Sequence, residues 1–138
     1  EYNVRMGDPE CQTILPLLKT DFLEVINSCC DEKLDNLKIE WKDQKSLCIV
    51  VCSKGYPEKF QNNIKINNLK KLNLDKNDYI FHAGTKLDGD ITKTNGGRVM
   101  AITSFGKNIE QALARSYVNA VQINFKGKNY RKDIGFDL

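Results

Sequence analysis

The chain of 138 residues carries a formal net charge of +3, and 41% of its residues are apolar. This length suits one ordinary globular domain with room for a hydrophobic core. The charge is too small and too dispersed to indicate a nucleic-acid-binding surface, and no apolar run is long enough to span a membrane. We therefore expect a cytoplasmic protein whose partners are neither nucleic acids nor membranes.

The cysteines are odd in number, form no CxxC pair and accompany a single histidine, His82. This pattern argues against a zinc site. His82 fits a hydrogen-bonded strand residue better than a catalyst. The cysteines lie mostly among apolar residues, so we expect five reduced and largely buried thiols: Cys11, Cys29, Cys30, Cys48 and Cys52.

The first five residues alternate polar and apolar side chains, which is the period of a half-buried strand. On such a strand Glu1, Asn3 and Arg5 leave from one face. A carboxylate and an amide oxygen side by side suit a hard cation such as Mg²⁺, and Arg5 offers a planar fork for a phosphate or carboxylate. The alternative is the exposed polar face of an edge strand. Because the sequence starts inside this pattern and without Met, we expect a fragment of a longer chain.

Two short helices should follow this strand. The turn Gly7-Asp8-Pro9 places its proline at the first position of a helix, which Pro16 then limits. Asp21 and Glu24 have the spacing of a capping box for a second helix, ending near residues 31–33. The apolar residues of this second helix recur at helical spacing, which is typical of a stripe packed in a core: Phe22, Leu23, Val25, Ile26, Cys29 and Cys30.

Strand signals begin after residues 34–36, where we place a domain boundary. The run from Ser46 to Cys52 is apolar and β-branched, as in a buried strand. Asn95-Gly96 is a strong hairpin signal because both residues tolerate positive φ. The remaining strands, at 38–41, 78–83, 91–94 and 99–104, should complete an antiparallel meander.

A long helix should follow the meander. Asn108 has the features of its N-cap, with Gln111 three residues further on. The sequence as a whole therefore predicts an α+β fold. Residues at helical spacing form the expected buried stripe of this helix: Ile109, Ala112, Leu113, Tyr117, Ala120 and Val121.

The first twelve residues, Glu-Tyr-Asn-Val-Arg-Met-Gly-Asp-Pro-Glu-Cys-Gln, resemble the last metal-binding strand of the ATP-grasp ligases. Within that superfamily they are similar to the glycinamide ribonucleotide synthetases (phosphoribosylamine–glycine ligases). The resemblance covers only the C-terminal part of that family. It continues in order through the segments Leu15–Asp21, Ser53–Pro57, Phe81–Lys86, Thr94–Val99 and Tyr130–Gly135.

The resemblance implies two parts of unequal size. Residues 1–35 would be the C-terminal tail of an ATP-grasp domain, a strand followed by two helices. Residues 36–138 would be the family's small C-terminal domain, which is antiparallel, β-rich and rudiment single-hybrid-like, with a long helix. The family's nucleotide-binding N-terminal domain and most of its ATP-grasp domain have no counterpart in this sequence.

The resemblance also implies roles for the N-terminal residues. Glu1 and Asn3 would be two ligands holding Mg²⁺ or Mn²⁺ against the phosphates of ATP, and Arg5 would stabilise the transferred phosphate or the acyl phosphate. Asp8 and Glu10 would bind the amine of glycine or of 5-phosphoribosylamine. The alternative is that Asp8 orders the turn and Glu10 favours the helix N-terminus.

A second implied site follows the expected strand at 91–94. The family motif makes Asn95, Gly96 and Gly97 a backbone that approaches an anionic ligand, with Arg98 taking a ribose 5-phosphate. From the residues alone, the same stretch is a hairpin turn with a solvated arginine. Lys86 and Arg131 are within the family-like segments as well, but they fit surface charges better.

The family's reaction joins glycine to 5-phosphoribosylamine in purine synthesis, with hydrolysis of ATP to ADP and phosphate through glycyl phosphate. We expect this chain to belong to such an enzyme, with the rest of the enzyme as its partner, and to be inactive alone. One alternative is a non-catalytic β-rich lid or binding module. Another is a part of a different ATP-grasp carboxylate–amine ligase.

Overall fold

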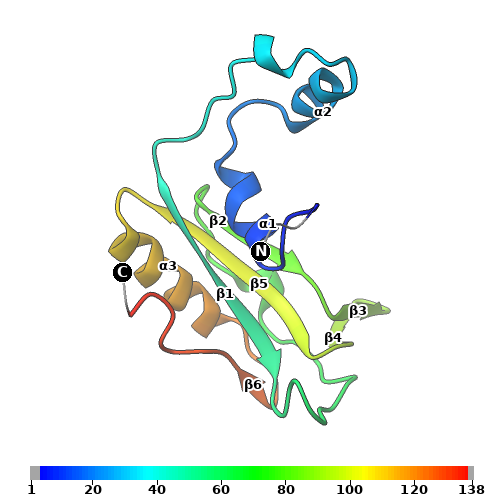
Figure 1. Ribbon diagram of the computed structural model, residues 1–138. Coiled ribbons are helices and arrows are strands. Elements are labelled where there is room, and N and C mark those ends of the chain that lie inside the picture. Colours follow the sequence, from blue (N-terminus) through cyan, green and yellow to red (C-terminus); the bar gives the residue numbers. More distant parts are fainter. Residues whose placement is uncertain (1–3, 137–138) are drawn as a thin grey trace.

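A four-stranded antiparallel sheet forms the centre of the computed structural model, which describes residues 4–136 (Figure 1). Its strand order is β2 (Asp78–His82), β5 (Arg98–Gly106), β1 (Lys45–Ser53) and β6 (Lys128–Asn129). The expected buried strand at 46–52 is thus β1, and the expected strand at 78–83 is β2. Within the described residues, no helix is both long and apolar enough to cross a bilayer.

The core lies on one face of this sheet. Along β1 the side chains alternate, so that Leu47, Ile49 and Val51 are buried and the residues between them are half-buried. β5 is buried from Val99 to Gly106, because elements cover both of its faces and strands pair with both of its edges. The central position of β5 explains its near-continuous run of apolar and small side chains.

The helix α3 (Ile109–Gln122) covers the core face, and its N-cap is as predicted: the Asn108 side chain accepts a hydrogen bond from Gln111 N at 3.0 Å. Ala112 and Ala120 are buried as expected, but Val121 is 62% exposed, which corrects the predicted stripe. Val121 follows Ala120 by one residue, which turns its side chain about 100° away from the sheet. Ser116 is buried instead, where its hydroxyl donates to Leu47 O at 2.7 Å.

The helix α1 (Glu10–Ile14) and the 3-10 turn η1 (Leu15–Leu17) form the expected short helix after the cis Asp8-Pro9 bond, although Pro9 is its N-cap and not its first residue as predicted. α1 packs on the opposite face of the sheet from α3 (Figure 1). Two strand hydroxyls hold its backbone there: Thr103 Oγ1 donates to Gln12 O at 3.0 Å, and Ser46 Oγ donates to Thr13 O at 2.8 Å. The sheet is therefore sandwiched between two helices.

The helix α2 (Phe22–Cys30) has the predicted N-cap, since Asp21 accepts a hydrogen bond from Leu23 N at 2.8 Å. The apolar stripe of this helix is not packed in a core formed by the described residues, so that prediction is wrong. The helix projects away from the sheet (Figure 1), and Leu23, for example, is 62% exposed. A 3-10 turn, η2 (Leu34–Asn36), follows, and the expected strand at 38–41 reduces to a single bridge between Trp41 and Leu18.

The strands β3 (Thr85–Asp88) and β4 (Ile91–Thr94) form a separate two-stranded hairpin. The expected hairpin at Asn95-Gly96 is therefore wrong: β4 pairs with β3, and β5 pairs with β2 and β1. Positive φ occurs at Gly89, in the β3–β4 turn, and not at Gly96. An Asn-Gly pair marks a change of direction, but it does not identify the strands on either side as partners.

The long connection between β1 and β2 contains one short 3-10 turn, η3 (Leu69–Lys71). Its apolar residues anchor it to the core: Ile66 is buried, and Ile64, Leu69 and Leu72 pack against the buried cluster. These anchors let a polar, asparagine-rich segment follow the surface without regular secondary structure.

All five cysteines are free thiols, but the prediction that they are largely buried is wrong. Cys29 and Cys30 are exposed on α2, and the other three are half-buried. Cys48 and Cys52 leave β1 on the face opposite the core, where burial raises the pKa of each thiol. The apolar sequence around Cys48 and Cys52 correctly predicted the strand β1, but it did not show which face of that strand packs against the core.

Candidate functional site

Family-like segments that are far apart in the sequence meet at the N-terminal end of β5. In the sheet, Arg98 lies opposite Cys52. The Ser53 hydroxyl donates to Gly96 O at 3.1 Å, and Ser53 N donates to Gly97 O at 2.8 Å. The motif 94–99 is therefore fastened to the motif 53–57 by backbone geometry.

Two glycines of the predicted anion site lie in close contact with other chain segments. A Cβ added to Gly97 would overlap the ring of Tyr56. The backbone of Gly96 lies against Gly84, and a Cβ added to Gly96 would lie 3.0 Å from Gly84 Cα. Gly84 N also donates to Arg98 O at 2.8 Å. The glycines therefore let three chain segments meet without side chains between them.

The structure brings two of the predicted site residues together. Arg98 Nη1 lies 2.9 Å from Asp8 Oδ2, and both side chains are about half exposed. The other oxygen of this carboxylate, Asp8 Oδ1, accepts a hydrogen bond from Gln12 Nε2 at 2.8 Å. A guanidinium predicted to bind an anion and a carboxylate predicted to bind an amine thus lie side by side at the surface.

Two other predicted residues make only local contacts in the structure. Glu10 Oε2 accepts a hydrogen bond from Gly7 N at 2.7 Å, which orders the turn before α1. Arg5 is exposed and its Nη1 donates to Met6 O at 3.0 Å. Glu1 and Asn3, the predicted metal ligands, lie outside the described residues. Between residues 4 and 136, no three His, Cys, Asp or Glu side chains are grouped to hold a metal ion.

A hollow of about 400 Å³ adjoins the Asp8–Arg98 pair; we call it the outer hollow. Its walls come from the turn before α1, the half-buried face of β1, the segment after β1 and the segment after β6. The family-like motifs contribute six of its lining residues: Pro9, Tyr56, Arg98, Tyr130, Arg131 and Ile134.

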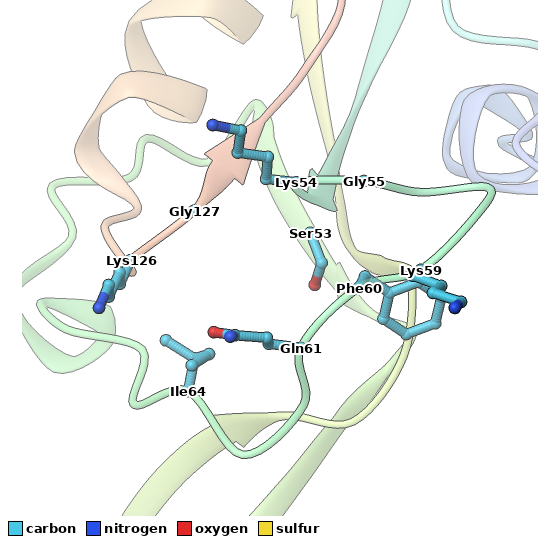
Figure 2. A pocket seen from close by; sticks show the side chains of 9 residues that line it. All are labelled: Ser53, Lys54, Gly55, Lys59, Phe60, Gln61, Ile64, Lys126 and Gly127. Atoms are coloured by element: carbon cyan, nitrogen blue, oxygen red, sulfur yellow. The ribbon is translucent and has the colours of Figure 1, made fainter.

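A larger hollow of about 610 Å³ lies beyond the end of β1, as Figure 2 shows. The Ser53 hydroxyl and the Gln61 amide point into it. Lys54, Lys59 and Lys126 line it, but their ammonium groups lie on different sides and do not converge (Figure 2). This geometry does not form a focused anion site, so the outer hollow is the better candidate.

His82 fits the structural role expected for it, since its Nδ1 lies 2.9 Å from Thr85 Oγ1 at the start of β3. Sequence reasoning did not select Gln12, Tyr56 and Tyr130, and it treated Arg131 as a surface charge. All three lie within the family-like segments, but only the folded chain shows that Tyr56 and Tyr130 line one hollow and that Gln12 contacts Asp8.

Residues 46–137 match the family model described as phosphoribosylglycinamide synthetase, C domain. The chain belongs to this family. Its β-rich body, a mixed α/β domain with antiparallel sheets, is the family's C-terminal domain, as the resemblance predicted.

Two relatives are similar in sequence to almost the whole of this chain. A phosphoribosylamine–glycine ligase of Fusobacterium nucleatum is 47% identical over 98% of this chain, which covers 32% of that protein. A bifunctional purine biosynthetic protein of Dictyostelium discoideum is 44% identical over 98% of the chain and 17% of its own length.

A solved structure agrees with these relatives. The crystal structure of a phosphoribosylamine–glycine ligase from Thermotoga maritima matches with a TM-score of 0.73 and 31% identity. The match covers 96% of this chain and 32% of that one. The present chain thus spans about a third of the length of such ligases, and it corresponds to their C-terminal region.

Proposed function

We propose that this chain is the C-terminal part of a cytoplasmic enzyme that joins glycine to 5-phosphoribosylamine. The products would be glycinamide ribonucleotide, ADP and phosphate, formed from ATP through glycyl phosphate. The observation that carries the proposal is the near-complete match to phosphoribosylamine–glycine ligases. The meeting of the Gly-Asp-Pro and Asn-Gly-Gly-Arg motifs at the Asp8–Arg98 pair supports it.

In this proposal Asp8 and Arg98 have complementary roles at one surface. The Asp8 carboxylate would accept hydrogen bonds from the amine of a substrate, and the Arg98 guanidinium would bind the 5-phosphate. Asn95, Gly96 and Gly97 would let the phosphate approach the backbone. Glu10 would act at the same turn as Asp8, either on the amine or by holding the turn through Gly7.

In this proposal, residues among the first five bind the metal ion and act in phosphoryl transfer. Glu1 and Asn3 would hold Mg²⁺ or Mn²⁺, because carboxylate and amide oxygens are suitable donors for such ions. A bound cation would supply charge neutralisation of the ATP phosphates. Arg5 would stabilise the transferred phosphate, and its exposed position leaves it accessible to a ligand held by the rest of the enzyme.

The proposal divides the chain at residue 35. Residues 1–35 would complete an ATP-grasp domain, and residues 36–138 would form the C-terminal domain, of rudiment single-hybrid-like type. The exposed apolar side chains of α2 support this division, because an apolar stripe of this kind needs a partner surface. The missing part of the ATP-grasp domain would supply that surface.

The test is an assay of ADP formation that depends on both glycine and 5-phosphoribosylamine. The full-length enzyme carrying this chain should show it, and the 138-residue chain alone should not, because the adenine-binding part of the fold is absent. Arg98→Met in the full-length enzyme should raise KM for 5-phosphoribosylamine. Full activity of the short chain, or a full-length enzyme that uses a different amine or acid, would overturn the proposal.

A further inference from the structure

The two oxygens of the Asp8 carboxylate are held by different residues. Arg98 Nη1 lies 2.9 Å from Oδ2, and Gln12 Nε2 donates to Oδ1 at 2.8 Å. Gln12 lies on α1, about one helical turn after Asp8, whereas Arg98 begins β5. In the part of the chain that the structure describes, Asp8 and Arg98 thus share a single close contact, and a side-chain amide occupies the oxygen that a second contact would use.

This arrangement matters because an arginine and a carboxylate readily pair through two parallel hydrogen bonds. In such a closed pair, both oxygens of Asp8 and one edge of the Arg98 guanidinium would be used by each other. The guanidinium would then offer fewer donors to an anion, and the carboxylate would offer fewer acceptors to an amine. The Gln12 amide favours the open arrangement, because it competes with Arg98 for Oδ1.

The amide of Gln12 is held at this position from two sides. The backbone oxygen of Gln12 accepts a hydrogen bond from Thr103 Oγ1 on β5 at 3.0 Å, so this turn of α1 is fixed on the sheet. The side-chain oxygen Oε1 is buried, and it has no hydrogen-bond partner among residues 4–136. A buried acceptor without a donor destabilises a fold. An apolar side chain of similar size would avoid this cost, so stability alone does not explain a glutamine here.

We propose that Gln12 is a positioning residue, which holds the Asp8 carboxylate so that Asp8 and Arg98 act as two separate binding groups. This inference rests on the proposed function, in which Asp8 accepts hydrogen bonds from an amine and Arg98 binds a phosphate. Gln12 acts through Asp8 and not on the substrate itself, because its remaining oxygen is buried.

The first test compares stability with activity in the full-length enzyme carrying Gln12→Met, a side chain of similar length without the amide. The midpoint of thermal unfolding should be unchanged or higher, because the unpaired oxygen is removed and the half-exposed Asp8 can bind water instead. The value of kcat/KM for 5-phosphoribosylamine should fall about tenfold or more, as expected for a hydrogen bond to a charged group. KM for ATP should stay within about twofold, a change well below one such bond.

Gln111→Met is the matched control. The Gln111 side-chain oxygen accepts a hydrogen bond from Lys107 N at 3.1 Å, and these residues have the same spacing as Gln12 and Asp8. Gln111 belongs to α3, on the opposite face of the sheet from α1 (Figure 1). In this variant, kcat/KM for 5-phosphoribosylamine should therefore stay within about twofold of wild type.

The variant Gln12→Glu tests the hydrogen bond itself. It keeps the size of the side chain but places a second negative charge against Asp8, so it should impair the enzyme at least as much as Gln12→Met. If Gln12→Glu keeps full activity, the hydrogen bond to Asp8 is not required and the inference is wrong.

A double-mutant cycle tests whether Gln12 acts through Asp8. When Asp8→Ala is already present, Gln12→Met should change kcat/KM by less than about twofold, because the group that Gln12 positions has been removed. Independent losses that multiply in the double variant would overturn the inference.

The remaining outcomes separate this inference from the proposed function. A wild-type enzyme without ADP formation dependent on glycine and 5-phosphoribosylamine would overturn the proposed function itself. An active wild type in which Asp8→Ala is impaired but Gln12→Met is not would overturn only the role of Gln12. A joint loss of stability and activity in Gln12→Met would also overturn that role, by showing a structural effect.

Discussion

The helices α2 and α3 have similar amphipathic sequences and opposite environments. α3 lies across the sheet and buries Ala112, Ser116 and Ala120, whereas α2 projects from the body and has no buried residue. Helical periodicity predicts that the apolar face of a helix packs against another surface, but it does not identify that surface. The body formed by the sheet and α3 thus buries its apolar faces within this chain, whereas α2 leaves its apolar face exposed.

The largest expected effect is on stability, when a buried residue of the body is replaced and compared with an apolar residue of α2. Ile102→Ala should destabilise the chain by about 2–5 kcal/mol, because Ile102 is fully buried in β5. Ile26→Ala should change the stability of the same chain by less than about 0.5 kcal/mol, since Ile26 is exposed. Urea unfolding of both variants measures the difference.

The same pair of variants then sharpens the comparison in the full-length enzyme. If α2 is covered there, Ile26→Ala should become clearly destabilising while Ile102→Ala keeps its effect. Equal, large losses for both variants in the short chain would show that α2 is already part of its core.

A second prediction compares a hydrogen-bonded carboxylate of the body with an exposed carboxylate near α2. Asp78 Oδ2 accepts hydrogen bonds from Arg115 Nη2 and from Asp75 N, each at 2.9 Å, at the edge of the body. Burial pushes the pKa of Asp78 up, but hydrogen bonds from Asp75, Ser104, Asn119 and Arg115 together outweigh it and the pKa is lowered. Its contribution to stability is therefore present at neutral pH, and it is lost as the pH falls below the ordinary range of an aspartate.

Asp78→Asn should remove this contribution, at a cost of about 2 kcal/mol at neutral pH, and flatten the acid limb of the stability curve. The control is Glu40→Gln, which breaks exposed ion pairs with Lys19 and Lys38 near the base of α2. It should cost clearly less than Asp78→Asn. Denaturant midpoints between pH 2 and pH 7, a window that spans the ordinary aspartate pKa, provide the measurement. An unchanged acid limb in Asp78→Asn would rule out this role.

The smallest expected effect concerns the end of α3. Lys128 Nζ donates to the carbonyls of Ala120, Val121 and Ile123, at 3.1, 3.2 and 2.6 Å, and so caps the last turn of the helix. Lys128→Met should cost about 1 kcal/mol, because it keeps the apolar stem and removes the charge at the helix C-terminus. Lys126→Met, at an exposed neighbour, should have little effect. Thermal unfolding of both variants compares them, and equal stabilities would show that the cap contributes nothing.

Local chemistry made parts of this fold predictable. The β-branched run of β1 and the caps at Asp21 and Asn108 each depend on residues that are close in sequence, and each was confirmed. The Asn95-Gly96 hairpin failed because strand pairing depends on distant segments, here β1 and β2 on either side of β5.

The candidate site shows the same limit. The resemblance named Asp8 and Arg98 separately, but their contact at 2.9 Å exists only because α1 docks on the face of the sheet near β5. The roles of these residues, and those of Glu1 and Asn3, stay predictions. No local pattern predicts that Arg131 lines the same hollow as Arg98, since their segments are brought together by the strands on either side of β1.

The pairing of β1 with β5 has a consequence for how the chain folds. The register joins Cys52 to Arg98 and Lys45 to Gly106, so roughly fifty residues must form a closed loop before this central ladder exists. Contacts of β5 with β2 and α3 are much closer in sequence, and local contacts form faster. We therefore expect β2, β5 and α3 to gain amide protection before β1 in pulse-labelling hydrogen exchange. Simultaneous protection of β1 and α3 would instead place the ladder in the folding nucleus.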